Sequence, residues 1–218
     1  MAGAEPSFDA VLFDLLTALL DSWTLWNNVA GSPEDGGRWR AAYLSRTYGA
    51  GAYRLYEAMV REAATEAGLS STLAQHLAGR YGELEPWPEV REVLGTLRRR
   101  GMALGVVTNC SEKLAAKAID CTGIGFDVIV TAERAGYYKP DLRPYRMALD
   151  ELGVKAERCL FVAGSAYDLI GTHQVGLPTY WHNRIGMRLP PNAPEPIAHE
   201  RSLYPLLAIA RTGASIAD

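Results

Sequence analysis

From residue 89 to residue 181, segments with a helical pattern alternate with short apolar runs, and a similar run precedes them at 10–14. Apolar runs this short are typical of buried strands rather than helices. Strands that alternate with helices predict a parallel sheet with helices on both faces. We expect strands at 10–14, 103–107, 126–130, 159–162 and 178–181, and helices at 89–100, from about 111 with the hydroxyl of Ser111 as N-cap, at 143–152 and from 166. The fold class is therefore predicted to be α/β, with a doubly wound, Rossmann-like parallel sheet as its core.

A long helical block interrupts this alternation after the first strand. Between residues 22 and 81, bulky residues recur at intervals of three or four, as at Trp39, Tyr43 and Thr47, and no strand-like alternation is present. The prolines of segment 85–89 mark the return to the main domain. We predict a core domain formed by residues 1–20 and 85–218, with an inserted α-helical cap subdomain at residues 21–84.

Composition limits the classes of partner. The 218 residues carry a net charge of −3 and are 48% hydrophobic, which fits a soluble globular protein with no affinity for nucleic acid or an anionic membrane. The N-terminus lacks the basic and apolar regions of a signal peptide. The three cysteines have neither disulfide-framework nor zinc spacing, and the four histidines are not spaced as metal ligands. We expect a cytoplasmic protein with a small-molecule partner and no cofactor.

Polar residues follow the predicted strands at several points where a site is expected. Asp14 ends the first strand, Thr108 and Asn109 follow the second, and Gly164 and Ser165 follow the fourth. Ligands bind parallel sheets beyond the carboxyl ends of their strands, so these residues should meet at one rim, joined there by Lys139 from the loop after the third strand. A carboxylate at the end of a buried strand is well placed to act as a covalent nucleophile.

Four segments in this order resemble the haloacid dehalogenase superfamily. They are Phe13-Asp14 with Asp21-Ser22, Val107-Thr108-Asn109, Tyr138-Lys139-Pro140-Asp141, and the run from Phe161 to Asp168. The likeness covers nearly the whole chain, including a helical cap between the first two segments. Each motif alone is weak, but four in the correct order with a cap of suitable length form a strong signal.

Two substitutions point away from the phosphatases of that superfamily. The resemblance implies that a phosphatase would carry a second acid at position 16, where this chain has Leu16, and an acid pair whose first member is replaced by Gly164. Magnesium prefers several oxygen ligands, and this site is poor in them, although Asp168 remains. We therefore predict no metal ligands and a metal-independent enzyme.

The L-2-haloacid dehalogenase branch resembles the chain more closely. The cap run Trp39-Arg40-Ala41-Ala42-Tyr43-Leu44 is similar to the Trp-Arg pair and following Leu of that branch. The run Lys139-Pro140-Asp141-Leu142-Arg143-Pro144-Tyr145 is similar to its Lys-Pro-Asp-x-x-x-Tyr signature, and Tyr167-Asp168 to its late aromatic-Asp step.

The resemblance implies a role for each matching position. Asp14 would be the nucleophile, Asp168 would help to position water, and Arg40 would face the substrate carboxylate or the leaving halide. Further roles are implied as follows: carboxylate binding by Thr108 and Asn109, support of the nucleophile by Lys139 and Tyr145, an apolar pocket lined by Leu16, Leu44 and Tyr167, and substrate-side contacts of Thr17 and Ser165.

Some positions depart from the family pattern and leave alternatives open. Members usually carry Gly-Thr where this chain has Thr17-Ala18, so the hydroxyl of Thr17 would have to replace the missing one. Near the last motif, Ser and Asn are replaced by Ala163 and Ser165. These changes concern water activation and nucleophile support. They leave open the alternative function of opening a strained ring, such as that of azetidine-2-carboxylate, by the same displacement.

The leading hypothesis is a hydrolase that displaces a substituent at carbon two of a short 2-substituted carboxylic acid, through an aspartyl ester. A 2-haloacid dehalogenase is its main form, because cations at Lys139 and Arg40 would offset the repulsion between an anionic substrate and an anionic nucleophile. A magnesium-dependent phosphatase and a non-catalytic binding module are the alternatives from other classes. Trp23, Trp26 and Asn27 are candidates for either the hinge of the cap or the substrate, and Tyr48, Tyr53 and Tyr56 for a contact within a homodimer.

Overall fold

A six-stranded parallel sheet forms the centre of the molecule. The structure is a computed structural model and describes residues 8–191 and 193–211. The strands are β1 (Ala10–Phe13), β2 (Ala103–Thr108), β3 (Val128–Thr131), β4 (Cys159–Ala163), β5 (Thr179–His182) and β6 (Ala198–Glu200), in the spatial order β3-β2-β1-β4-β5-β6, and every neighbouring pair is parallel. The strand order reverses between β1 and β4, which is where doubly wound sheets bind ligands. The predicted α/β fold class is confirmed.

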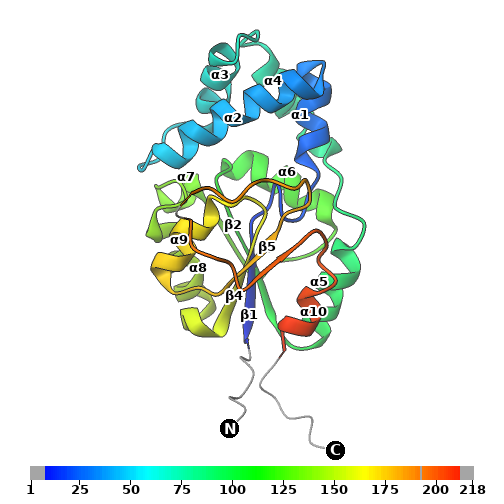
Figure 1. The fold of residues 1–218 in the computed structure, drawn as a ribbon, viewed down its shortest axis with the longest axis vertical. Coiled ribbons are helices and arrows are strands. Elements are labelled where there is room, and N and C mark those ends of the chain that lie inside the picture. The colour runs from blue at the N-terminus through cyan, green and yellow to red at the C-terminus, as the bar shows by residue number, and fades with distance from the viewer. Residues whose placement is uncertain (1–7, 192, 212–218) are drawn as a thin grey trace, which may run out of the picture.

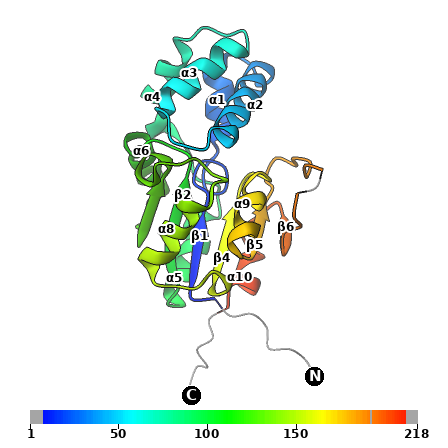
Figure 2. The same ribbon diagram turned by 90° about the vertical axis from the view of Figure 1, so that its left-hand side faces the viewer.

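Helices cover both faces of this sheet, as the predicted alternation requires (Figures 1 and 2). Successive side chains of a strand point to opposite faces. Val11 and Phe13 of β1 accordingly pack in the apolar cluster that also holds residues of α5, α6 and α10, whereas Ala10 and Leu12 pack with α8 and α9. The helices of the core are α5 (Val90–Arg99), α6 (Glu112–Thr122), α7 (Ala132–Ala135), α8 (Leu142–Leu152), α9 (Asp168–Val175) and α10 (Leu206–Ile209), with short 3-10 turns at Tyr81–Glu83 and Ala156–Arg158.

Four further helices lie beyond the carboxyl ends of the strands, at the top of Figure 1. They are α1 (Ser22–Ala30), α2 (Pro33–Gly49), α3 (Tyr56–Glu66) and α4 (Leu73–Gly79), and we refer to them as the cap. Gly36 allows α1 and α2 to approach closely, because a Cβ atom there would lie 2.7 Å from the Cα of Asn27. Trp39 is fully buried and donates its indole N–H to the carbonyl of Val60, 2.9 Å away, so α2 is fixed to α3.

Two chain segments connect the cap to the core. Leu20 and Pro86 form an antiparallel bridge, and the amide of Asp21 donates to the carbonyl of Glu85 at 2.8 Å. The side chain of Asp21 also caps α1 by accepting from the amide of Thr24. The predicted division at residues 20/21 and 84/85 falls at these paired segments, and as a division into domains it stays a prediction.

The structure differs from the sequence-based expectations in three places. The sheet has a sixth strand, β6, which follows the proline-rich segment 189–196 and is too short and too exposed to carry an apolar pattern. Helices α7 and α10 have four residues each, fewer than a periodic pattern needs. Ser111 does precede α6, but its hydroxyl donates to Glu57 Oε1 of the cap at 2.8 Å instead of capping the helix. The amide of Glu112, in the first turn of α6, donates to Glu133 Oε2 instead.

Within the described ranges, the helices are all too short or too polar to cross a lipid bilayer.

Candidate active site

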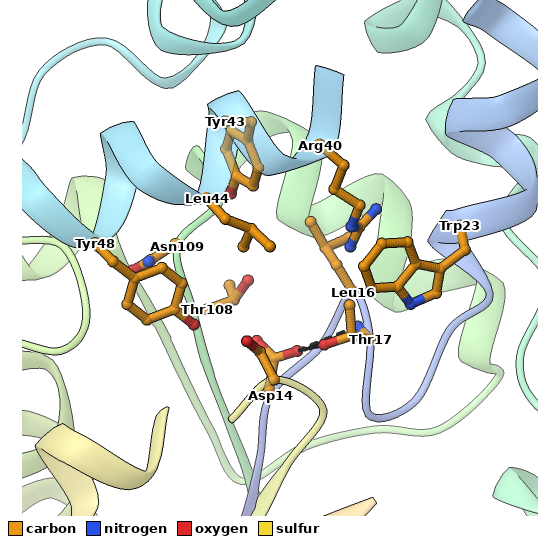
Figure 3. Close-up of a pocket in the computed structure, with 11 residues that line it drawn as sticks. Asp14, Leu16, Thr17, Trp23, Arg40, Tyr43, Leu44, Tyr48, Thr108 and Asn109 are labelled. Atoms are coloured by element: carbon orange, nitrogen blue, oxygen red, sulfur yellow. Dashed lines mark hydrogen bonds between the residues drawn. The ribbon is translucent and has the colours of Figure 1, made fainter. Parts of the chain in front are cut away.

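A small cavity lies between the carboxyl ends of the strands and helix α2 of the cap (Figure 3). Its volume is about 30 Å³. The lining residues come from both sides of the seam between cap and core: Asp14, Leu16, Thr17, Thr108, Asn109 and Ser165 from the core, and Trp23, Arg40, Tyr43, Leu44 and Tyr48 from the cap. The predicted convergence of strand ends on one rim is therefore found here.

Asp14 is held by donors on both of its carboxylate oxygens. The amide and the hydroxyl of Thr17 donate to Oδ2 at 3.1 and 2.6 Å, and the ammonium of Lys139 donates to Oδ1 at 2.8 Å. Burial by itself would raise the pKa of Asp14, but the charge of Lys139 and these hydrogen bonds outweigh it and hold the pKa below its usual value. The hydroxyl of Thr17 thus makes the contact that Ala18 lacks, and Asp14 is ionised at neutral pH.

The loop that carries Thr17 is fixed from outside the cavity. Trp87 donates its indole N–H to the carbonyl of Thr17 at 3.1 Å, and Nδ1 of the buried His182 lies 2.8 Å from the carbonyl of Ala18. Because a carbonyl oxygen only accepts, Nδ1 of His182 carries the proton. The contact with Ala18 gives His182 a structural role.

Lys139 lies between two carboxylates. Its ammonium is 2.8 Å from Asp14 Oδ1 and 2.9 Å from Asp168 Oδ1, and its side chain is 1% exposed. Burial alone would lower the pKa of Lys139, but the two negative charges raise it above the ordinary value, so the ammonium stays charged. The predicted proximity of Lys139 to Asp14 is confirmed.

Asp168 begins α9 and is completely buried. Three donors converge on its Oδ1: Lys139 Nζ at 2.9 Å, the hydroxyl of Tyr145 at 3.1 Å and the hydroxyl of Tyr48 at 3.2 Å. Its Oδ2 has no hydrogen-bond partner among the described residues. Burial and the nearby charge of Asp14 raise the pKa of Asp168 to about 6, although Lys139 opposes the shift. A carboxylate with this pKa accepts a proton readily near neutral pH.

Tyr145 does not contact the nucleophile as expected. Its hydroxyl donates to Asp168 instead, because α8 places its ring edge-on against Phe161 of β4, with the ring centres 5.4 Å apart. Its support of Asp14 is therefore indirect, through the carboxylate of Asp168 and the ammonium of Lys139.

Arg40 supplies a second positive charge from the cap side. The residue is 2% exposed, and its Nε and Nη1 have no hydrogen-bond partner within the described part of the chain. The guanidinium lies 4.0 Å from the centre of the Trp23 ring and 5.3 Å from that of Trp26, and burial lowers the pKa of Arg40. A buried guanidinium is costly without an anionic partner, so this geometry suits an anionic ligand.

Thr108, which ends β2, and Asn109, which follows it, differ in what they offer a ligand. The amide group of Asn109 is bound to the backbone of Lys139: Oδ1 accepts from its amide at 2.6 Å, and Nδ2 donates to its carbonyl at 3.1 Å. This clamp fixes the Lys139 backbone, and Asn109 also lines the cavity, so its expected contact with the substrate carboxylate stays a prediction. Thr108 is buried, and its hydroxyl lies in the cavity (Figure 3), where it has no partner among the described residues.

The remaining predicted site residues are mostly found at the cavity. Leu16 and Leu44 line it as expected, and so does Ser165. Tyr167 lies one layer further out, where its ring packs against that of Tyr48 with 5.1 Å between the ring centres. The expected pocket contact of Tyr167 is therefore taken by Tyr48.

Tyr43 and Tyr48 line the cavity but were not among the predicted site residues, and Trp23, a candidate for either the hinge or the substrate, lines it as well. A signal for Tyr48 was present, since Arg40, Leu44 and Tyr48 follow one another at intervals of four on one face of α2. The suggested homodimer role of the cap tyrosines is not supported by their positions. Tyr56 is fully buried and its hydroxyl lies 2.6 Å from that of Tyr81, and Tyr53 stacks on Tyr138 of the same chain.

The donor set does not fit a magnesium site. The Lys139 ammonium occupies the position between the two carboxylates, and Leu16 contributes no oxygen. An acid at position 164 is excluded by space as well, because a Cβ atom there would lie 2.2 Å from Thr17 Oγ1 and 2.3 Å from the amide of Ala18. Across residues 8–191 and 193–211, His, Cys, Asp and Glu side chains form no cluster of three or more suited to a metal ion.

Comparison with known proteins agrees with this geometry. The family model for haloacid dehalogenase-like hydrolases matches residues 8–176. An (S)-2-haloacid dehalogenase from Pseudomonas sp. (strain YL) is 32% identical over 144 residues, which cover 65% of this chain and 62% of that protein. The match thus spans about three fifths of the length of that curated relative.

Solved structures share the fold over nearly the full length. The crystal structure of a dehalogenase superposes with a TM-score of 0.82 at 27% identity, covering 95% of this chain and 99% of that one. The crystal structure of an L-2-haloacid dehalogenase does so with a TM-score of 0.83 at 26% identity, covering 93% and 98%. The resemblance seen in the motifs is confirmed, and this chain belongs to the haloacid dehalogenase-like hydrolase family.

Proposed function

We propose that this protein hydrolyses short 2-haloacids, displacing the halide at carbon two through an ester on Asp14. The observation that carries the proposal is Asp14, paired with the buried Lys139, in the wall of a cavity that Arg40 also lines; Nε and Nη1 of Arg40 have no hydrogen-bond partner among the described residues. Formal charges of Asp14, Asp168, Lys139 and Arg40 sum to zero, so an anionic substrate meets no net repulsion from them. The matching dehalogenases named above support the same reaction class.

In the first half-reaction, Asp14 attacks carbon two of the substrate. A carboxylate oxygen has two lone pairs; Oδ2 uses both to accept from Thr17, whereas Oδ1 uses one to accept from Lys139. Oδ1 therefore keeps a lone pair for the new bond to carbon. The carbon–halogen bond breaks as this bond forms, and the halide leaves with the electron pair. Arg40 faces the substrate carboxylate or the departing halide, and the free hydroxyl of Thr108 offers a further hydrogen bond.

In the second half-reaction, water hydrolyses the ester. Asp168 Oδ2 takes a proton from a water molecule whose oxygen bonds to Cγ of Asp14. The bond between Cγ and the ester oxygen then breaks, and the hydroxy acid leaves with that oxygen and the proton held by Asp168. The carboxyl group of Asp14 loses its remaining proton to solvent. The free Oδ2 atom and the pKa of about 6 suit Asp168 to this role as base.

The cavity favours small substrates. The volume of the cavity is only about 30 Å³. Its walls are the large side chains of Leu16, Tyr43, Leu44 and Tyr48, each anchored in a helix or loop of the closed seam. We therefore propose acids of two or three carbons, such as chloroacetate and 2-chloropropionate, as the preferred class.

A substrate panel tests the proposal. The purified protein and the Asp14→Asn variant are incubated with chloro-, bromo- and fluoroacetate and with both enantiomers of 2-chloropropionate, and halide release is measured. We expect release by the wild type and at least about a 10⁴-fold loss in Asp14→Asn, because the nucleophile is absent. Folded wild type that releases no halide from any of these acids contradicts the proposal. Azetidine-2-carboxylate and an aryl phosphate with magnesium, included in the panel, test the ring-opening and phosphatase alternatives.

We also propose a cytoplasmic location and no nucleic-acid or membrane partner. Support comes from the net charge of −3 and from Cys110, Cys121 and Cys159, which are all free thiols. A homodimer stays a prediction, which sedimentation of the purified protein tests.

A further inference from the structure

Tyr48 connects the cap directly to the carboxylate that activates water. It lies in the last turn of α2, and its hydroxyl donates to Asp168 Oδ1, across the seam, at 3.2 Å. Its ring packs on that of Tyr167, the residue before Asp168, with an interplanar angle of 30°. Tyr48 also lines the cavity, and in Figure 3 its hydroxyl points down toward the core. Neither the motifs nor the proposed chemistry gives this residue a part.

The donors around Asp168 are unevenly distributed between its two oxygens. Oδ1 receives Lys139, Tyr145 and Tyr48, which is more than its two lone pairs accept in ideal geometry, whereas Oδ2 has no partner among the described residues. This arrangement fixes the rotation of the carboxylate about its Cβ–Cγ bond. As a result Oδ2 is the oxygen left for water. Lys139 and Tyr145 belong to the core, so Tyr48 is the donor that depends on contact between cap and core.

We propose that Tyr48 is a positioning residue for ester hydrolysis, which completes the orientation of Asp168 only while the cap rests on the core. The inference rests on the proposed function. The inference predicts an effect on the second half-reaction alone, because displacement of the halide uses Asp14, Lys139 and Arg40 and does not use Asp168 as a base. Loss of the Tyr48 hydroxyl should therefore slow the attack of water on Cγ of Asp14 while halide release from the first turnover continues at its normal rate.

The Tyr48→Phe variant removes the hydroxyl and keeps the ring on Tyr167. With chloroacetate in rapid-quench experiments, chloride release in the first turnover and the amount of esterified protein, measured by intact mass spectrometry, are followed together. We expect hydrolysis to slow about tenfold, the value of one hydrogen bond to a charged group, with chloride release in the first turnover changed less than twofold. Esterified protein then accumulates in the variant above the wild-type level.

Two tyrosine variants serve as controls. Tyr53→Phe also alters a cap tyrosine that packs on the core, through Tyr138, but it lies outside the cavity, and we expect wild-type values for both half-reactions. Tyr145→Phe removes a core donor from the same oxygen of Asp168 and should slow hydrolysis in the same selective way.

The pH profile gives a readout that a purely structural role would not move. Asp168 faces Lys139, Tyr145, Asp14 and Tyr48. Because a donor stabilises the charged form of a carboxylate, its loss raises the pKa of Asp168. The acid limb of the hydrolysis rate in Tyr48→Phe should therefore move to higher pH.

The outcomes separate the inference from the proposed function. Equal slowing of both half-reactions in Tyr48→Phe, or hydrolysis at the wild-type rate, overturns the role of Tyr48 while leaving the proposed function intact. Wild-type protein that neither releases chloride nor forms an ester overturns the proposed function and this inference together.

Discussion

The core side and the cap side of the cavity are built on different principles. On the core side, Asp14, Lys139 and Asp168 form a chain of buried charges in which each group has an opposite partner within 2.9 Å. On the cap side, Arg40 is equally buried but rests on the face of Trp23 without a hydrogen bond to its Nε or Nη1 from the described residues. The charged groups of the core are therefore paired before any substrate binds, whereas Arg40 of the cap has no anionic partner among the described residues.

This difference assigns separate tasks to the two regions. A prearranged nucleophile and its counter-charge need no reorganisation during reaction, which is how electrostatic preorganisation lowers a barrier. The Nε and Nη1 atoms of Arg40 have no hydrogen-bond partner in the described part of the chain, so they are available to the anionic group of the proposed substrate. We infer that the core supplies the chemistry and the cap supplies the binding energy, with Tyr48 as the link between them.

Removing the charge at Lys139 should have the largest effect, on stability and activity together. Lys139→Met leaves two carboxylates buried near each other, and breaking a buried pair in this way costs about 3–5 kcal/mol. We expect the free energy of unfolding, measured by urea titration at pH 7.5, to fall by about this amount, and activity to fall about 10³-fold. The loss of stability should be smaller at pH 5, because the pKa values of both carboxyls rise without Lys139 and one of them then protonates. An unchanged urea midpoint would show that the core charges are not coupled.

Removing the charge at Arg40 should affect activity without the cost in stability. Arg40→Met keeps much of the volume against Trp23 and Trp26 and leaves no partner unsatisfied. We expect kcat/KM to fall about 10²-fold, mostly through KM, while the free energy of unfolding stays equal or rises. A large loss of stability in this variant would mean that Arg40 is already paired in the free protein, and the contrast between the two sides would fail.

A smaller loss of activity is expected from a substitution at Gly164, whose lack of a side chain leaves room for Thr17. Gly164→Ser would place a Cβ atom 2.2 Å from Thr17 Oγ1, so the loop must shift and Thr17 must release Asp14. Overpacking of this kind costs about 1–3 kcal/mol, and we expect about a tenfold loss of kcat. Thr17→Gly in the same chain should recover part of the stability. If the two substitutions prove additive in a double-mutant cycle, the residues are not coupled.

The pH dependence of turnover should show the mildest effect. The pKa of Asp168 is raised to about 6, and a general base works only when it is ionised. The rate of ester hydrolysis should therefore fall as the pH drops through about 6, whereas Asp14, with its lowered pKa, stays ionised in this range. Single-turnover ester formation should thus be flat between pH 5.5 and 7.5. A parallel decline of both half-reactions would remove the distinction between the two carboxylates.

The sequence predicted the sheet, and topology placed Asp14 and Lys139 at one rim, because Asp14 follows a strand and parallel strands end at the same rim. Asp168 was named from the resemblance to the family, and the structure places it at the start of the helix after β4. The partners of Asn109 and Tyr145 could not be read in this way. Their motifs matched, but the hydrogen-bond partner of each side chain depends on the path of the loop around Lys139 and on how α8 packs against the sheet.

Contacts across the seam were the least predictable part of the site. Helical spacing in α2 places Arg40, Leu44 and Tyr48 on one face, yet only the position of the cap over the core decides that this face meets Asp168. The strand β6 was missed for a different reason, since it has only three residues, two of them exposed, and therefore carries no apolar alternation.

A single turnover in water labelled with oxygen-18 tests the central claim most directly. Enzyme in molar excess over chloroacetate converts each substrate molecule once, and mass spectrometry then locates the label. If Asp14 attacks carbon, the hydroxy acid carries the unlabelled oxygen that came from Asp14, and the peptide that contains residue 14 gains 2 Da. Labelled hydroxy acid with an unlabelled Asp14 peptide would mean that water attacks the substrate directly, which contradicts the account.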